Sequence, residues 1–134
     1  MNKYALMLKN GEGGSQNLEE ARKWFKKAAE NNHIYAIFHY ALMLREGEGG
    51  DTNLEEAREL FKKAAGEGNK DAEYHYALML YKNGEGVEQD LGKARELFRN
   101  AAEKGNTNAK FHYAQMVKKG EGRDQNPRKK ARKS

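Results

Sequence analysis

Apolar and polar positions along this chain follow two helical patterns, and the first is apolar on most of its surface. The segment 71–82 contains no Gly or Pro. Its main apolar residues share the i, i+4, i+7, i+8 spacing of one helix face: Ala72, Tyr76, Met79 and Leu80. A second apolar stripe flanks the first: Tyr74, Leu78 and Tyr81. A helix of this kind is normally buried, so we expect the segment, which we call helix A, to lie in an inner layer.

The second pattern is amphipathic and covers residues 53–65. Its apolar residues fall on a single face: Leu54, Ala57, Leu60, Phe61 and Ala64. Glu, Lys and Arg occupy the other positions. Asn53 precedes the pattern and Glu56 follows three residues later, a spacing typical of a helix N-cap and capping box. We call this second predicted helix helix B and expect it to bury one face.

Both patterns recur at a nearly constant interval. The sequence Tyr-Ala-Leu-Met-Leu begins at Tyr4, Tyr40 and Tyr76, and a degraded copy begins at Tyr113, so the spacings are 36, 36 and 37 residues. A Gly-Glu-Gly loop follows each copy, at 11–13, 47–49, 84–86 and 120–122. Glycine just after a helix permits the left-handed conformation that ends it. A fixed period of this size indicates a solenoid, in which each unit buries its apolar face against the next.

The predicted fold is therefore all-α, with no strand pattern in the sequence. We expect a right-handed α-solenoid of about three and a half stacked helix-turn-helix repeats. The single array would cover residues 1–122, with units at approximately 1–32, 33–68, 69–105 and a partial unit at 106–122. Residues 123–134 would form a basic C-terminal tail or a truncated helix.

The repeated residues resemble the Sel-one-like repeat family, a relative of the tetratricopeptide repeats, over about residues 3–122. The matching positions in the third unit are small or aromatic residues and two caps: Asn69, Ala72, Gly84, Gly86, Asp90, Ala94, Phe98, Ala101 and Ala102. One feature departs from the family pattern. The family's Leu-Gly-x2-Tyr is replaced by Tyr-Ala-x2-Leu, as at Tyr76, Ala77 and Leu80. Because total side-chain volume is roughly kept, we expect the packing to survive this exchange.

The resemblance implies that the A helices line a concave surface on which partners bind. By correspondence with tetratricopeptide groove positions, the partner-binding residues would be Phe38, Leu42, Tyr74, Leu78, Tyr81, Phe111 and Gln115. Four cations would fringe them: Arg45, Lys82, Lys118 and Lys119. Aromatic side chains in a shallow groove suit an extended or helical peptide. The alternative is that the same side chains pack between neighbouring helices.

The formal net charge of +5 comes entirely from the C-terminal segment. Residues 123–134 hold six basic residues and one acid, while residues 1–122 hold 19 basic and 19 acidic residues. The basic tail residues are Arg128, Lys129, Lys130, Arg132 and Lys133. They could form a nuclear-import patch or contact nucleic acid or another anionic surface, although aromatic residues for base stacking are absent among them. A solvated end, or the start of a further helix B, is the simpler interpretation.

Several kinds of chemistry are not supported by the sequence. The chain has no cysteine, which excludes disulfides and thiolate metal sites and favours a reducing, cytoplasmic location. Its longest apolar run, about five residues, is far too short to span a membrane. His39, His75 and His112 occupy equivalent positions in successive units, about 8–10 Å apart in stacked helices, so they could not meet at one metal ion. We expect them to form a ladder of partly buried, hydrogen-bonded side chains. No cofactor is expected, because the Gly-Glu-Gly loops lack the strand and the Lys-Ser/Thr of a phosphate-binding loop.

The function predicted from the sequence is a non-enzymatic protein-protein interaction scaffold that presents a concave helix A surface to a peptide or protein. The alternative is a structural or self-assembling element of a larger complex or longer repeat protein, because open array ends invite stacking between chains. Binding of nucleic acid would depend on the basic tail alone.

Overall fold

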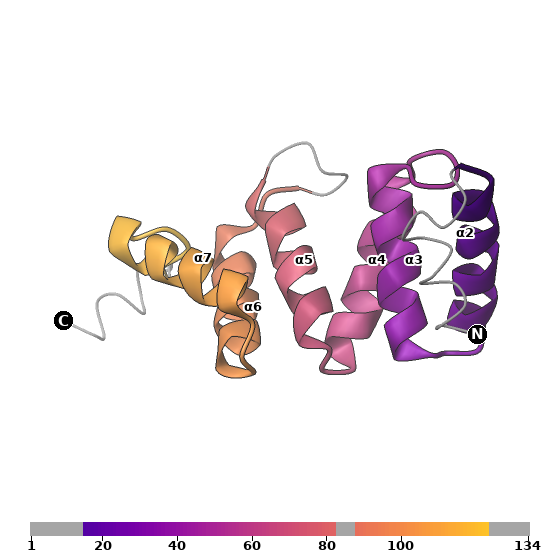
Figure 1. Ribbon diagram of the computed structural model, residues 1–134. Coiled ribbons are helices and arrows are strands. Elements are labelled where there is room, and N and C mark those ends of the chain that lie inside the picture. The colour runs from indigo at the N-terminus through magenta and orange to yellow at the C-terminus, as the bar shows by residue number, and fades with distance from the viewer. Residues whose placement is uncertain (1–14, 83–87, 124–134) are drawn as a thin grey trace.

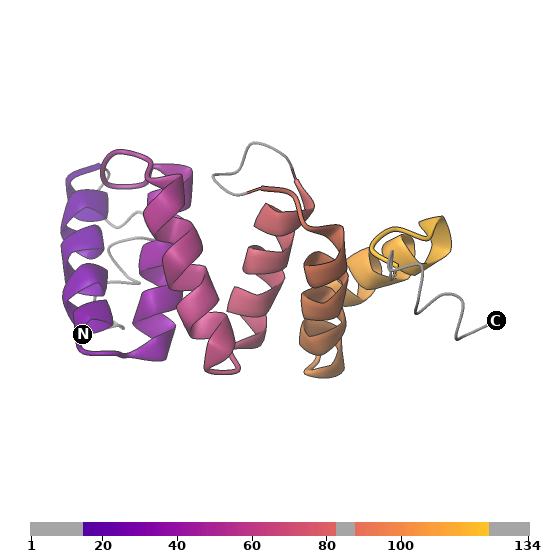
Figure 2. The same ribbon diagram turned by 180° about the vertical axis from the view of Figure 1, so that it is seen from behind.

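The computed structural model describes residues 15–82 and 88–123, and this part of the chain is a single row of helices. The helices are α2 (Ser15–Glu30), α3 (Ile34–Glu46), α4 (Leu54–Gly66), α5 (Lys70–Tyr81), α6 (Leu91–Glu103) and α7 (Thr107–Lys119). No strand occurs in these two described ranges. Each helix packs against the next one in the chain, so the row runs from α2 at one end to α7 at the other (Figure 1; Figure 2 shows the opposite side). The predicted all-α solenoid is confirmed.

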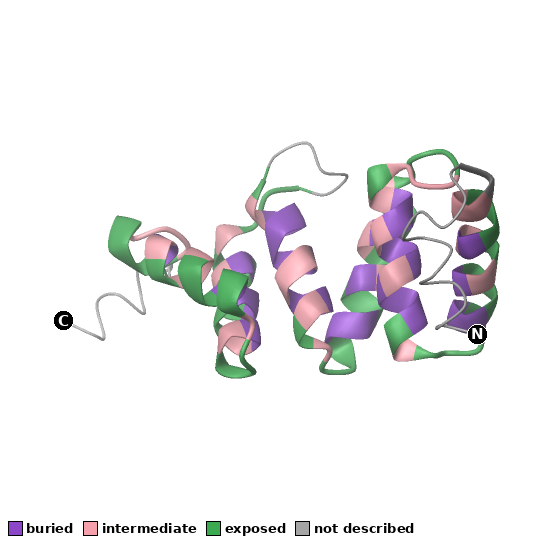
Figure 3. Ribbon diagram, in the orientation of Figure 1, coloured by how far each residue is buried: buried purple, intermediate pink, exposed green. Residues whose placement is uncertain are grey.

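The two sequence patterns correspond to two classes of helix. α3, α5 and α7 are A helices, and α2, α4 and α6 are B helices. The expected helix over 71–82 is α5, and the one over 53–65 is α4. Seven residues of α5 are buried: Ala72, Glu73, Tyr76, Ala77, Leu78, Met79 and Leu80. α4 buries only one face, made of Ala57, Phe61, Ala64 and Ala65. In Figure 3 the ribbons of α3 and α5 carry many buried residues, as expected for helices in an inner position, whereas α7 is mostly exposed.

The A helices all start with the same capping interaction. The side-chain oxygens of Asn69 and Asn106 each accept a hydrogen bond of 2.8 Å from the backbone N–H of the residue three positions later. In α3 the imidazole Nδ1 of His33 takes this role and accepts from Ala36 N at 3.3 Å. His33 is thus a helix cap, a role that the spacing of apolar residues does not reveal.

The B helices begin with half of the capping box that the sequence predicts. Asn53 Oδ1 accepts from Glu56 N at 3.0 Å, as expected. The reciprocal bond is replaced, because the backbone N–H of Asn53 donates to the Leu44 carbonyl of the preceding A helix at 2.8 Å. The equivalent Asp90 N–H donates to Leu80 O at 2.8 Å. This backbone bond therefore fixes each of these B helices against the end of its own A helix.

The Gly-Glu-Gly loops connect neighbouring units rather than only reversing the chain. Gly47 and Gly120 end α3 and α7 in the left-handed conformation, as predicted. The second glycine of the loop, Gly49, also has a positive φ of 71°. A Cβ at this position would collide with the carbonyl oxygen of Leu18, at the start of the preceding B helix. Gly122 meets Leu91 in the same way.

Arginines on the B helices hold these loops in place. Arg22 on α2 donates from Nη1 to the Glu48 carbonyl at 3.2 Å and from Nη2 to the Asp51 carbonyl at 2.8 Å. Two units further along the array, Arg95 on α6 donates to the Glu121 carbonyl at 3.0 Å. The loop backbone is thereby bound to the helix of the preceding unit by both close packing and charged hydrogen bonds.

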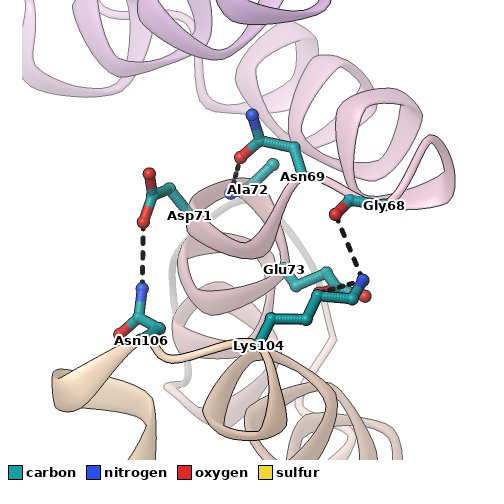
Figure 4. A network of polar contacts seen from close by, with 7 residues as sticks. All are labelled: Gly68, Asn69, Asp71, Ala72, Glu73, Lys104 and Asn106. Atoms are coloured by element: carbon teal, nitrogen blue, oxygen red, sulfur yellow. Dashed lines mark hydrogen bonds and ion pairs between the residues drawn. The ribbon is translucent and has the colours of Figure 1, made fainter.

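A polar network closes the opposite edge of the third unit. Lys104 Nζ donates to the Glu73 carboxylate at 2.9 Å and to the Gly68 carbonyl at 3.1 Å (Figure 4). The Glu73 side chain is only 6% exposed, so this ion pair satisfies a buried charge. Asn106 Nδ2 donates to Asp71 Oδ1 at 3.1 Å. The network ties α5 to the end of α6 and to the start of α7.

The contact of Gly49 with the preceding unit gives a testable expectation. Gly49→Ala should lower the free energy of unfolding by about 1–3 kcal/mol, because the added Cβ meets backbone and the positive φ is strained for alanine. Gly66→Ala is the matched control. No atom lies within 4 Å of a Cβ at position 66 at the end of α4, so alanine there should stabilise by about 0.5–1 kcal/mol. Urea unfolding followed by circular dichroism measures both, and equal effects of the two substitutions would contradict the role given to Gly49.

Candidate peptide-binding face

The A helices are joined to the preceding B helices by stacked pairs of Phe and His. His39 stacks on Phe25, His75 on Phe61 and His112 on Phe98, with ring centroids 5.2, 5.5 and 5.1 Å apart and interplanar angles of 20°, 14° and 11°. Each phenylalanine is fully buried and each histidine is half-buried. The three histidines are partly buried, as expected, but the contact that repeats along the row is ring stacking and not the expected hydrogen bonding. Within the described residues no group of three or more His, Asp or Glu side chains could hold a metal ion.

The residue before His39 and the residue before His75 each bridge two units. Phe38 lies 6.0 Å from Phe61 of its own B helix and 5.5 Å from His75 of the next A helix. Tyr74 repeats this arrangement, 5.8 Å from Phe98 and 5.7 Å from His112. Phe38 is 7% exposed, whereas Tyr74 is half-buried. Phe38 therefore serves mainly packing, and Tyr74 combines packing with an accessible edge.

The residues four positions after Phe38, Tyr74 and Phe111 also range from buried to partly accessible. Leu78 is buried, while Leu42 and Gln115 are half-buried. Phe111 is 61% exposed, because no described helix packs on the far side of α7. Of the seven residues predicted to bind a partner, five are thus at least partly accessible: Leu42, Tyr74, Tyr81, Phe111 and Gln115.

Tyr81 is held by the following unit. Its hydroxyl donates to the Glu121 carboxylate, with distances of 2.9 Å to Oε1 and 3.2 Å to Oε2, and its ring meets Phe98 edge-on at 6.3 Å. The hydrogen bond to Glu121, followed by burial, raises the pKa of Tyr81 above its usual value. The hydroxyl is therefore a fixed donor to the loop, and the ring is the part that another molecule could contact.

Cations lie beside these aromatic side chains. The mostly buried guanidinium of Arg45 is 3.0 Å from His75 Nδ1 and 3.6 Å from the Glu46 carboxylate, and Lys82 and Lys119 are exposed. Burial raises the pKa of Tyr74, and the charge of Arg45 opposes that rise. Burial lowers the pKa of His112, and the charge of Lys82 lowers it further. The accessible edge of α5 and α7 thus combines aromatic side chains with exposed cations, whereas the α3 equivalent of Lys82 is the exposed Glu46.

Two equivalent hollows lie elsewhere, between B helices and loops. One, of about 450 Å³, is lined by Arg22, Tyr40 and Gly49 among others, and its counterpart of about 330 Å³ by Arg95, Tyr113 and Gly122. The arginine of each hollow hydrogen-bonds loop carbonyls, as described above. These hollows therefore belong to the contact between units.

Two further sequence-based predictions concern the basic tail and the possibility of a membrane span. The basic tail residues Arg128, Lys129, Lys130, Arg132 and Lys133 lie outside the described residues. None of the helices in the described part has the length and apolar character needed to cross a membrane.

Comparison with known proteins finds the same repeat along the chain. The family model for the Sel1 repeat matches four times, at residues 1–33, 34–69, 70–106 and 107–133. A solved structure with a similar fold is c5321, a protective antigen present in uropathogenic Escherichia coli strains displaying an SLR fold, with 30% sequence identity and a TM-score of 0.83. A second is a Sel1 repeat protein from Oxalobacter formigenes, with 32% identity and a TM-score of 0.82. Each of these two similarities covers 90% of this chain. The chain spans 26% of the length of the first protein and 49% of the length of the second. No curated protein matches the chain.

The lowered pKa of His112 makes stability depend on pH. The folded state favours the neutral form of the imidazole more than the unfolded chain does. In the unfolded chain the histidine titrates with its ordinary pKa near 6.5. Stability contributed by His112 is therefore present above that pH and is lost as the pH falls toward the lower, folded-state pKa. His112→Phe keeps a ring on Phe98 and removes the titration. We expect the wild type to lose more stability than this variant between about pH 7.5 and pH 5.5, as measured by urea midpoints. Parallel pH profiles for the two proteins would refute this.

Proposed function

Because this chain belongs to the Sel1 repeat family, we propose that it binds a peptide or protein segment along the accessible edge of its A helices. Sel1 repeat proteins are generally non-enzymatic scaffolds for protein interactions. The observation that carries the finer proposal is the placement of a half-buried aromatic side chain beside a cation at two places along the row of helices. Tyr74 with Arg45, and His112 with Lys82, are two such places on adjacent units.

The chemistry of this edge suits a partner that is both apolar and acidic. Leu42, Tyr74 and Tyr81 provide apolar area that is already ordered by packing, so little side-chain entropy is lost on binding. Exposed Lys82 and Lys119 provide charge complementarity for carboxylates, which favours both specificity and the rate of association. The contacts are shallow and recur along the row of helices. This geometry suits an extended or helical peptide lying along the array rather than a compact small molecule.

One further part of the proposal rests on the sequence, and an alternative role rests on the exposed surface of α7. The absence of cysteine fits a reducing compartment, so we place the interaction in the cytoplasm. The alternative role, as a self-assembling element, is favoured by the exposure of apolar residues on α7 and predicts association that depends on protein concentration.

The proposal is tested by selecting peptides from a random display library on the immobilised full-length chain. Selected peptides should be enriched in Asp, Glu and aromatic residues. Replacing Lys82 and Lys119 with Glu should weaken their binding by about tenfold or more, because two attractive charges become repulsive. The matched control is Lys26→Glu with Lys62→Glu, which makes the same change of net charge at equivalent, exposed positions of two B helices.

The control variant should bind like the wild type. If both variants weaken binding equally, the effect reflects net charge and not the A-helix edge. If the Lys82 and Lys119 variant binds normally, the assigned face is wrong. Circular dichroism of each variant shows that the helices are intact.

A further inference from the structure

The three described A helices are in side-chain contact with one another, so their accessible residues form one continuous surface. Phe38 on α3 lies 5.5 Å from His75 on α5, and Tyr74 on α5 lies 5.7 Å from His112 on α7. On each helix this surface includes a stripe with the i, i+4, i+7, i+11 spacing of one helix face. On α3 the stripe consists of Tyr35, His39, Leu42 and Glu46, all at least partly accessible.

The stripe becomes more polar from α3 to α7. Its first position is Tyr35 on α3, Asp71 on α5 and Asn108 on α7. Its third position is Leu42, Leu78 and Gln115 in the same order. The second position is a half-buried histidine in all three helices. The apolar residues of the stripe therefore lie on α3 and α5, and α7 contributes none.

Positive charge changes in the opposite direction along the same row. The last position of the stripe is the exposed Glu46 on α3, whereas it is an exposed lysine on α5 and α7, Lys82 and Lys119. Glu46 lies 3.6 Å from Arg45, whose side chain is only 11% exposed, so the two charges on α3 largely offset each other. On α7 a second exposed lysine, Lys118, adds to the charge of Lys119. The C-terminal ends of the A helices thus become more cationic from α3 to α7.

The two gradients restrict the kind of segment that fits the whole row. A segment that is acidic throughout would place a carboxylate beside Glu46, where like charges repel. A segment that is apolar throughout would find no apolar partner in the stripe of α7. The best match has apolar residues over α3 and acidic residues over Lys82 and Lys119.

The length of the row favours an extended segment. Neighbouring packed helices lie about 10 Å apart, so three A helices span about 20 Å, which an extended chain covers with about six or seven residues. An amphipathic helix would need apolar residues along the whole row to receive its apolar face. The stripe on α7, with Asn108 and Gln115, does not supply them.

We propose that the segment bound along the A helices is extended and has a fixed orientation, with its apolar half on α3 and its acidic half on α5 and α7. This inference rests on the function proposed above and adds to it the order of residues in the partner. The chain distinguishes a partner in which apolar and acidic residues are segregated from one in which they are mixed.

Two fluorescein-labelled synthetic probes of equal composition and about eight residues test this order. The segregated probe is Leu-Tyr-Leu-Phe-Asp-Glu-Asp-Glu, and the mixed probe is Leu-Asp-Tyr-Glu-Leu-Asp-Phe-Glu. Fluorescence anisotropy with the full-length chain should show the segregated probe binding about fivefold more tightly, because its carboxylates avoid Glu46 and all lie toward the lysines.

A charge reversal on α3 should remove this preference. In the Glu46→Lys protein the mixed probe gains a cation over α3, so the two affinities should agree within about twofold. Glu59→Lys on α4 is the matched control. Glu59 is 53% exposed and 3.7 Å from Arg58, and Glu46 is 58% exposed and 3.6 Å from Arg45. The control protein should keep the wild-type preference, and circular dichroism should show that both variants are helical.

Crosslinking tests the orientation directly. A photoreactive residue at the apolar end of the segregated probe should label α3 (Ile34–Glu46), and one at the acidic end should label α7 (Thr107–Lys119). Mass spectrometry of the digested protein identifies the labelled segment. Reversed labelling, or labelling of one helix from both ends, would overturn the orientation.

The affinities separate this inference from the function on which it rests. Equal binding of the two probes to the wild type, or a preference that survives Glu46→Lys, overturns the order of residues. If both probes then bind the Lys82→Glu, Lys119→Glu protein weakly, the proposed binding edge stands and only the order is wrong. If both bind that protein normally, the binding edge is wrong as well. If neither probe binds the wild type, this inference fails, and the library selection still decides the proposed function.

Discussion

Every unit of this chain depends on its neighbour to bury a face, and the stack of His on Phe is the contact in which this dependence is most regular. Phe25, Phe61 and Phe98 belong to B helices, and the histidines that cover them belong to the following A helices. The second glycine of each described Gly-Glu-Gly loop, Gly49 or Gly122, reinforces the same junction from the other edge. A helix pair taken alone would leave a phenylalanine ring in water. Stability is therefore a property of junctions between units, as in a one-dimensional array.

The same constraint explains why accessible surface is unevenly distributed among equivalent residues. Phe38, Tyr74 and Phe111 occupy one repeat position but range from buried to largely exposed. The difference follows from what packs on each helix and not from the residue type. At this repeat position α5 offers the edge of a packed ring, whereas α7, on whose far side no described helix packs, offers most of the ring.

The sequence predicts the helices, their order and their main caps because these depend on local spacing. The period of apolar residues places α4 and α5 to within a residue or two, and Asn53 and Gly47 were recognisable as caps by type alone. Other features depend on contacts between units and could not be predicted in this way. His33 caps α3 in place of Asn, the N–H of Asn53 bonds to Leu44 and not to Glu56, and the carboxylate that binds the Tyr81 hydroxyl comes from the loop 40 residues later.

Because the repeats are so similar, a helix of one unit could in principle pack in the place of its equivalent in another. The buried ion pair between Glu73 and Lys104 opposes such an exchange. Glu73 is buried and needs Lys104, whereas the equivalent position of α3 is Ile37 and that of α7 is Lys110. If the helix carrying Lys104 were to pack on α3 in place of α4, Glu73 would lose its partner inside the protein. An unsatisfied buried charge costs about 3 kcal/mol or more, a large share of the stability of a domain of this size. The Phe–His stacks have nearly the same geometry in each unit where they are described, so they stabilise the array without specifying the order of its helices. The buried charged pair is found in the third unit and not at the equivalent positions Ile37 and Lys110, so it favours the native order of the helices.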